Sequence, residues 1–200
     1  MTGRPGERKD QILQVLAEML EEPRAGKITT AALAAKLDVS EAALYRHFAS
    51  KAQMFDSLIE FIEKTLFTFI NKMVAEEKSG IRQIEGILAL LLGFAKKNPG
   101  MTRVLIGDAL INENERLQNR VTQLHDRLEA TLKQALRFAV SQREIVEDLD
   151  VSAHANMLLC YVVGRWHQFA KSGFKRDPME YWEAQFREIV SSNSFGQVVS

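Results

Sequence analysis

The amino-acid sequence predicts an all-α protein with two domains, a three-helix domain over residues 1–50 and a larger helical bundle over residues 51–200. Two observations predict this class. Apolar residues recur at the three- and four-residue spacing of helices along most of the chain, and no segment alternates apolar and polar residues as a strand does. Of the 200 residues, 46% are hydrophobic and 26% are charged, which is enough apolar material for a sizeable core.

The first helix is expected over residues 7–22, where Ile12, Leu16 and Met19 fall on one face. Residues 23–26, which include a proline and a glycine, are expected to end it. The sequence therefore begins with one amphipathic helix that needs partners to cover its apolar face.

Residues 29–51 predict a helix, a tight turn, a second short helix and the start of a third. Thr29 or Thr30 can cap the first of these helices, because a hydroxyl accepts a hydrogen bond from an otherwise unpaired backbone N–H. Ser40 can cap the second helix, which covers residues 41–47. Two helices joined by such a turn form a helix-turn-helix, whose second helix enters the major groove of DNA.

The side chains on the outer face of this motif suit contact with DNA. Ala42 and Ala43 are small enough to let the helix approach base edges. Tyr45, His47 and Lys51 can donate hydrogen bonds to phosphates, which position a protein without reading sequence. A plain helical hairpin with polar surface residues is the alternative. The agreement of caps, turn and donors favours DNA binding.

The overall charge lacks the basic excess of many nucleic-acid binders, since Lys and Arg together equal Asp and Glu at 26 each. Residues 1–51 hold eight basic and seven acidic side chains. Arg4, Arg8 and Lys9 lie together, and Arg4 is available to reach DNA as part of a basic arm. We therefore expect modest, salt-sensitive DNA affinity.

Several other classes of protein are disfavoured. The one cysteine, Cys160, is expected to pack as a small apolar side chain, and the four histidines lack the spacing of metal ligands, so no metal site or cofactor is expected. No nucleophile has a suitably spaced base, so no catalytic residues are expected. The longest apolar run, residues 87–92, is too short to span a bilayer, and no signal-type segment is present. We expect a cytoplasmic protein that does not bind membranes.

The remaining chain predicts further helices. A long linking helix should begin at Lys51, and the last helix should begin at Pro178, a residue favoured at the first helical position. Both tryptophans lie in the final pair of helices, which suits either a core or a dimer interface. The linking helix and the four helices that follow it before the last one are expected over residues 51–78, 81–97, 101–109, 112–138 and 151–171.

The linking helix has apolar residues off its main stripe. At about 100° per residue, Phe69 falls within the stripe, whereas Phe61 and Phe67 fall outside it. Each of these two phenylalanines either packs against a further neighbour or is an exposed aromatic used for binding. Both interpretations are open from the sequence.

The helix expected over residues 81–97 carries a second unusual face. Leu90, Gly93 and Lys97 lie together opposite its apolar stripe. Glycine inside a helix costs about 1 kcal/mol relative to alanine. Close approach of another chain or close packing of a neighbouring helix would each offset this cost.

The run VSEAALYRHFASK, with Thr30 ten residues before Ser40, resembles the DNA-binding signature of the TetR family. This resemblance implies an all-helical homodimer whose last two helices form the dimer interface, so that residues 1–50 bind DNA and residues 51–200 bind the second subunit and partners. Asp38 lies where the family often has glycine, and aspartate tolerates the left-handed conformation of such a turn. The implied DNA contacts are to the backbone from Thr29, Thr30, Tyr45, His47 and Lys51, and to the bases from Ser40, Glu41, Ala42 and Ala43.

Residues 28–66 and 88–110 are similar to the nucleoid-occlusion branch of this family. Members of this branch bind palindromic double-stranded chromosomal sites as dimers and antagonise assembly of the tubulin-like division protein FtsZ. The resemblance implies location at the nucleoid. Two departures are Phe69 and Lys97, where an arginine is expected, so that bidentate hydrogen bonding is lost. The positions that match those holding the C-terminal tail of FtsZ are Phe61, Leu90, Gly93, Lys97 and Asn98.

Two other functions compete with this interpretation. A ligand-responsive TetR-type repressor would need a cavity in the C-terminal domain, and the large apolar side chains there make a small-molecule ligand the less favoured choice. An enzyme is disfavoured by the missing catalytic motifs.

Overall fold

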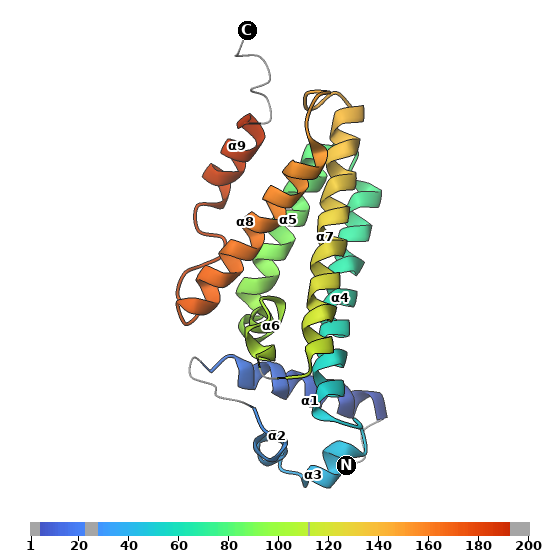
Figure 1. The fold of residues 1–200 in the computed structure, drawn as a ribbon, viewed down its shortest axis with the longest axis vertical. Helices are drawn as coiled ribbons and strands as arrows, with labels where there is room; N and C mark the ends of the chain where they lie inside the picture. Colours follow the sequence, from blue (N-terminus) through green and yellow to red (C-terminus); the bar gives the residue numbers. More distant parts are fainter. Residues whose placement is uncertain (1–4, 23–27, 112, 193–200) are drawn as a thin grey trace. The chain divides into compact units, whose positions relative to one another are not determined.

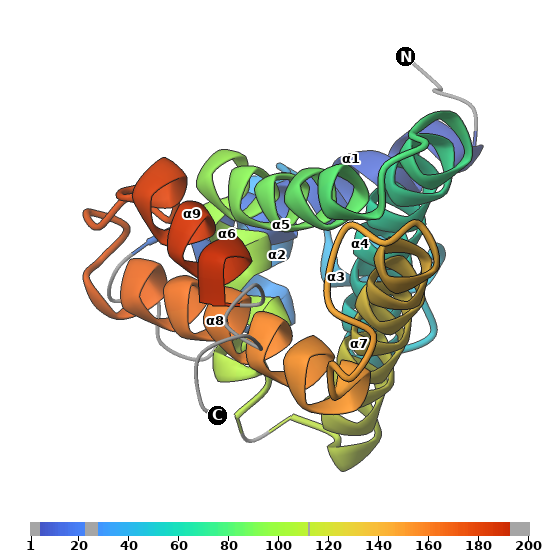
Figure 2. The same cartoon turned by 90° about the horizontal axis from the view of Figure 1, so that it is seen from above.

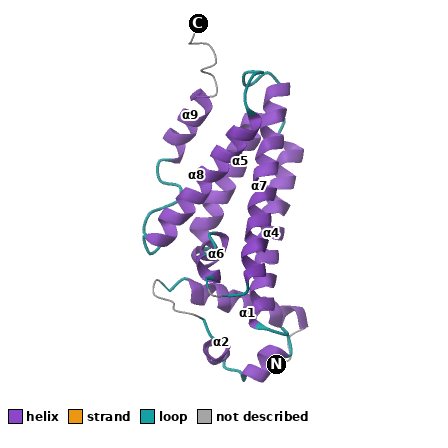
Figure 3. Ribbon diagram, viewed as in Figure 1, coloured by secondary structure: helices purple, strands orange, loops and turns teal. Residues whose placement is uncertain are grey.

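A computed structural model describes residues 5–22, 28–111 and 113–192, and every regular element within these residues is helical (Figures 1 and 3). The all-α prediction is confirmed. No helix among them is long and apolar enough to cross a membrane. The predicted arm residue Arg4 and the predicted break at residues 23–26 lie outside the described residues. The elements are α1 (Pro5–Leu20), α2 (Thr30–Lys36), α3 (Glu41–Tyr45), α4 (Lys51–Glu76), α5 (Gly80–Lys97), α6 (Pro99–Leu105), the 3-10 helix η1 (Asp108–Leu110), α7 (Glu115–Ser141), α8 (Val151–Lys171) and α9 (Trp182–Ser192).

The chain forms two compact units. The first comprises Met1–Glu63 and Asn98–Thr122, and the second comprises Lys64–Lys97 and Gln123–Ser200. Segment 98–122 thus belongs to the same unit as the helix-turn-helix, although it lies about fifty residues further along the chain. The sequence-based boundary at residue 50 stays a prediction.

In the first unit, α1 packs against α2 and α6, and α2 packs against α3. Gly100 makes the contact between α1 and α6 possible, because a Cβ at this position would overlap the backbone carbonyl of Ala17. Arg103 of α6 lies 2.9 Å from Asp108 and donates to the carbonyl oxygen of Leu20 at 3.3 Å. These contacts tie the C-terminal end of α1 to α6 and η1.

In the second unit, α5 packs against α8 and α9, as the two views agree (Figures 1 and 2). Trp166 of α8 is fully buried, and its indole N–H donates to the carbonyl oxygen of Leu91 at 3.1 Å. The ring of His125 lies 6.0 Å from the Trp166 ring. A large aromatic side chain therefore fills the interior between α5, α7 and α8.

The predicted faces of α4 are partly wrong. Phe61 is 46% exposed, as one of the two interpretations required. Phe69, predicted to face the core, is 55% exposed, whereas Phe67 is buried beneath the guanidinium of Arg127, whose Cζ lies 3.8 Å from the ring centroid. The buried face in the C-terminal half of α4 includes Ile70 and is rotated from that in the N-terminal half. A single helical wheel for all of α4 therefore misplaced Phe69, whereas the burial of Phe67 agrees with extra packing, one of the two interpretations of a phenylalanine outside the stripe.

Two predictions for the C-terminal part are also wrong. The last helix begins at Trp182 rather than at Pro178, because the backbone before it is held in an irregular loop. Cys160 is exposed on α8 rather than packed as a small apolar residue. The helix expected to begin at residue 112, which lies outside the described residues, is observed as α7 from Glu115.

Candidate functional site

The helix-turn-helix is held by the caps that the sequence predicted. The Thr29 hydroxyl oxygen accepts from the backbone N–H of Ala32 at 3.1 Å, and the Ser40 hydroxyl oxygen accepts from that of Ala43 at 3.2 Å. Asp38 occupies the turn with a φ of 53°, the left-handed conformation expected for this position. Local chemistry thus fixes where both helices begin and how the chain turns between them.

The motif packs on a small apolar core and leaves one face of α3 open. Leu33, Leu44 and Phe48 are buried beneath it. Ala42 is exposed and Ala43 is half-buried, so no bulky side chain of α3 itself covers this face. The other predicted base-facing residues, Ser40 and Glu41, are exposed, Tyr45 is exposed, and His47 is half-buried.

A hydrogen bond joins the first turns of the two motif helices. The Thr30 hydroxyl donates to a carboxylate oxygen of Glu41 at 2.5 Å. These residues are eleven positions apart and both were predicted to contact DNA. The contact fixes the start of α2 against the start of α3, and it occupies the one hydroxyl proton of Thr30.

Lys51, the predicted phosphate donor at the start of α4, already has an anionic partner. Its Nζ lies 2.5 Å from Oε1 of Glu113, and the two side chains are only 18% and 11% exposed. The same ammonium lies 5.6 Å from the ring centroid of Phe55. No local pattern in the sequence points to Glu113 as this partner, because it lies 62 residues from Lys51.

The second-unit residues predicted to bind a partner lie on one side of α5. Leu90 and Gly93 are half-exposed and Lys97 is exposed. A Cβ built at Gly93 would meet no described atom within 4 Å, so close packing of a neighbouring helix does not explain this glycine. The other two residues, Phe61 and Asn98, belong to the first unit; Phe61 is exposed on α4 and Asn98 is half-buried before α6.

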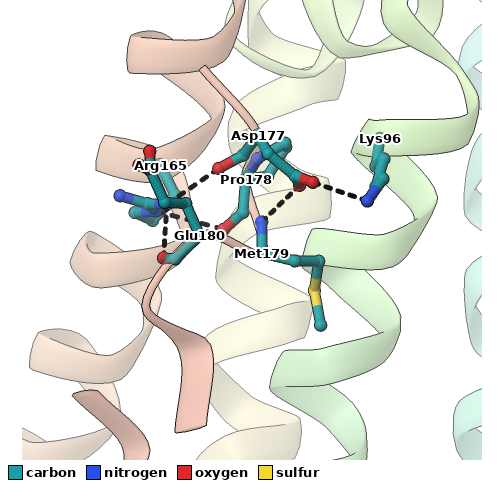
Figure 4. Close-up of polar contacts among 6 residues, drawn as sticks. All are labelled: Lys96, Arg165, Asp177, Pro178, Met179 and Glu180. Atoms are coloured by element: carbon teal, nitrogen blue, oxygen red, sulfur yellow. Dashed lines mark hydrogen bonds and ion pairs between the residues drawn. The ribbon is translucent and has the colours of Figure 1, made fainter. Parts of the chain in front are cut away.

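The two lysines that end α5 differ in their surroundings. Nζ of Lys96 lies 2.5 Å from Oδ2 of Asp177 (Figure 4). Lys97, in contrast, makes no ion pair with any described side chain. The hydrogen bond from Lys96 holds the pKa of Asp177 below its ordinary value, against a smaller opposing effect of desolvation. The Asp177 carboxylate is therefore charged at neutral pH, and the interaction is lost as the pH falls through its lowered pKa.

Arg165 of α8 organises the loop that leads to α9 (Figure 4). Its guanidinium donates to three backbone carbonyl oxygens, those of Asp177 at 2.8 Å, Pro178 at 3.1 Å and Glu180 at 2.7 Å. Tyr181 follows with a φ of 65° and is 65% exposed. Three side-chain hydrogen bonds thus hold this loop, and the positive φ of Tyr181 is incompatible with an α-helix, so α9 begins after it at Trp182.

The outer face of α8 carries small and apolar side chains. Met157 is 44% exposed, Cys160 is exposed, and a Cβ at Gly164 would meet no described atom within 4 Å. Spacings of three and four residues place all three on one side of the helix. This side of α8 is suited to close approach of another helix.

The described residues also bear on two other kinds of functional site, a metal site and a ligand-binding groove. They contain no group of three or more His, Cys, Asp or Glu side chains that could hold a metal ion. An open groove of about 630 Å³ lies in the second unit between the end of α4 and α7, with Val74, Gln83, Arg127 and Phe138 among its lining residues.

Comparisons with known proteins agree with this arrangement. Residues 12–58 match the family described as bacterial regulatory proteins, tetR family, and residues 78–192 match the tetracyclin repressor-like C-terminal domain of SlmA-like proteins. The chain is 50% identical over 192 residues to the nucleoid occlusion factor SlmA of Marinomonas sp. (strain MWYL1), covering 96% of this chain and 98% of that protein. It is 54% identical over 183 residues to SlmA of Alteromonas mediterranea, covering 90% and 92% of the two chains.

The fold agrees as well. A TetR-family transcriptional regulator from Agrobacterium tumefaciens superposes with a TM-score of 0.78 at 15% identity, over 96% of this chain and 100% of that chain. Such a distant likeness bears on the fold alone. Members of the matched family are DNA-binding regulators and not enzymes. The chain belongs to the TetR family of DNA-binding regulators and, within it, to the group of SlmA nucleoid occlusion factors.

Proposed function

We propose that the protein binds palindromic chromosomal sites as a homodimer and, when bound at the nucleoid, antagonises FtsZ assembly so that division does not occur over DNA. The observation that carries this proposal is the 50% identity with a nucleoid occlusion factor over 96% of the chain. The matching region includes the helix-turn-helix and also α5 and α6. Two proteins that shared only a DNA-binding motif would not need to be similar in α5 and α6.

DNA binding is assigned to the exposed face of α2 and α3. In this proposal Ser40, Glu41, Ala42 and Ala43 face the bases, because α3 carries small side chains on its open face. The remaining predicted residues contact phosphates and set the orientation of the motif; they are Thr29, Thr30, Tyr45, His47 and Lys51. A phosphate contact from the Thr30 hydroxyl requires its proton to leave Glu41. A palindromic site follows from two-fold symmetry, since each subunit presents one α3 to one half-site.

Dimerisation is assigned to the outer face of α8 and to α9. The small and apolar side chains at Met157, Cys160 and Gly164 let a second helix approach closely. The Arg165 hydrogen bonds set the path of the chain between the two helices, so that α9 and the exposed Tyr181 are presented in one position.

Arg165→Lys should weaken the dimer by at least about tenfold, because an ammonium cannot reproduce the planar fork that bonds three carbonyl oxygens. The measurement is sedimentation equilibrium over a range of concentrations. Arg82→Lys is the matched control, since Arg82 is exposed on α5, outside the assigned interface, and pairs with Glu85 of its own helix at 3.7 Å. Equal dissociation constants for both variants would contradict the assigned role of Arg165.

Partner binding is assigned to the exposed side of α5, with Phe61 and Asn98 as further contacts. Leu90 offers apolar surface, Gly93 leaves room for a peptide backbone, and Lys97 offers a cation for an acidic group. Lys96 is excluded from this role because its ammonium is held by Asp177. Exposed Phe69 stands where relatives are expected to carry arginine, so an apolar contact replaces a charged one there.

Leu90→Glu should abolish binding of an FtsZ C-terminal tail peptide while leaving DNA affinity unchanged, because it places a carboxylate in the apolar part of the surface. Lys97→Ala should weaken peptide binding several-fold, whereas Lys96→Ala, the adjacent residue of equal charge, should not. Fluorescence anisotropy with a labelled peptide measures peptide binding, and anisotropy with a labelled duplex measures DNA affinity.

The two lysine variants make this test specific to the site. Equal losses for Lys96→Ala and Lys97→Ala would indicate attraction by overall charge rather than a defined contact. Peptide binding that survives Leu90→Glu would remove α5 from the partner surface. Circular dichroism of each variant checks that the helices are retained.

A ligand-responsive repressor is the second candidate, and the groove beside Arg127 is the one observation in its favour. The filling of the α5–α7–α8 interior by Trp166 disfavours it. Mapping the chromosomal sites that the protein occupies in cells distinguishes the two functions. Many scattered sites that are depleted near the replication terminus support nucleoid occlusion, whereas one or two sites beside a transporter or enzyme gene support a repressor.

A further inference from the structure

The ion pair between Lys51 and Glu113 joins the DNA-facing end of α4 to the segment that precedes α7. Both residues belong to the first unit, and both side chains are mostly buried. The ammonium has a further favourable contact with the ring of Phe55. Lys51 is therefore held in place before any DNA arrives.

An ammonium held by a carboxylate is a weak ligand for phosphate. Its charge is already largely neutralised, so bringing it to DNA releases fewer counterions from the duplex. The carboxylate would also be brought towards the phosphates, where like charges repel. Full engagement of Lys51 by a phosphate therefore requires its pair with Glu113 to loosen or break.

We propose that Glu113 is an intramolecular competitor of the DNA phosphate for Lys51 and thereby sets the affinity of the protein for DNA. This inference rests on the proposed phosphate contact of Lys51. It assigns to segment 98–122, which shares the unit of the helix-turn-helix, a residue that acts on DNA binding without touching a base. The chain has no net charge, and pairing of Lys51 with Glu113 further reduces its general electrostatic attraction to DNA. Such a protein is expected to bind specific sites rather than DNA of any sequence.

The alternative is that Glu113 orients Lys51 towards the phosphate and so strengthens binding. The two roles predict opposite signs when the carboxylate is replaced by an amide of the same shape. Competition predicts that Glu113→Gln tightens DNA binding, and orientation predicts that it weakens DNA binding.

Glu113→Gln should increase the affinity for a palindromic duplex by about 3- to 30-fold at moderate salt, since two such pairs are released per dimer and each release accounts for up to about 1 kcal/mol of that gain. The slope of log K against log salt should steepen by about one for each subunit. The duplex is one selected with the wild-type protein from randomised oligonucleotides, and anisotropy titrations at several salt concentrations give both quantities. Glu115→Gln is the matched control, because this exposed acid lies two residues away and makes no described ion pair.

Lys51→Ala in the Glu113→Gln background should cancel the gain, because the freed ammonium is its source. A gain that persists in this double variant, or an equal gain for Glu115→Gln, would overturn the inference in favour of a general effect of charge. Weaker binding by Glu113→Gln would overturn it in favour of orientation. Wild-type protein that selects no duplex would refute the proposed DNA-binding function itself, whereas specific wild-type binding without the Glu113 effect refutes only this inference.

Discussion

Replacing Ala42 by phenylalanine is expected to lower affinity for the specific duplex by at least about 100-fold, or ~2.8 kcal/mol, while the melting temperature stays within a degree or two. Ala42 is exposed on α3, so a larger side chain costs nothing in the free protein. On DNA it would separate the helix from the base edges in both half-sites of the palindrome. Competition titrations against non-specific DNA measure the loss as a fall in the specificity ratio.

Ala42→Ser is the control for this prediction, because serine is small enough to keep the approach and should change affinity by less than about tenfold. A large loss for serine would mean that the methyl group itself makes the essential contact. Retention of specific binding by the phenylalanine variant would remove the exposed face of α3 from the DNA interface.

Trp166→Ala is expected to lower the free energy of unfolding by about 3–5 kcal/mol, which is a large fraction of the stability of a domain of this size. The side chain is fully buried and its N–H is bonded to the Leu91 carbonyl oxygen, so truncation leaves a cavity between α5, α7 and α8 and removes that hydrogen bond. Urea denaturation followed by circular dichroism at one fixed protein concentration measures the change.

Trp182→Ala is the matched control, since Trp182 is half-buried on α9 and stacks on Phe186 with ring centroids 5.1 Å apart. It should cost less in unfolding free energy but more in dimer affinity if α9 lies in the interface. Trp166→Phe, which keeps most of the volume, should cost less than Trp166→Ala. Equal losses for both tryptophan-to-alanine variants would contradict the central position assigned to Trp166.

The helical class and the helix-turn-helix could be predicted because their causes are local. Thr29 and Ser40 accept hydrogen bonds from backbone N–H groups three residues away. Asp38 itself adopts the positive φ that the turn requires. Hydrogen bonds of this kind can be predicted from a short segment of sequence, because both partners lie within it. Helical spacing placed Phe61 and Gly93 off the apolar stripes but left open whether neighbours cover them, and only the fold shows that Phe61 is exposed and that no described atom would meet a Cβ at Gly93.

The long-range partners could not be predicted. Lys51 and Glu113 are 62 residues apart, and Lys96 and Asp177 are 81 apart, so only the folded chain brings each pair together. The faces of Phe67 and Phe69 depend on which helices lie beside the C-terminal half of α4. Pro178 suits a helix start by itself. Tyr181, however, has a positive φ in the loop that Arg165 holds from α8, so α9 begins only after it.

The exposed Cys160 of α8 has a practical consequence. The sequence contains one cysteine, so a maleimide dye or a nitroxide spin label can be attached at one defined atom without removing any other thiol. Because Cys160 lies on the side of α8 assigned to the dimer, where close approach requires small side chains, a bulky label there should hinder association of the subunits. The rate at which a maleimide modifies Cys160, measured with DNA and partner peptide added in turn, therefore reports how far the dimer covers this thiol.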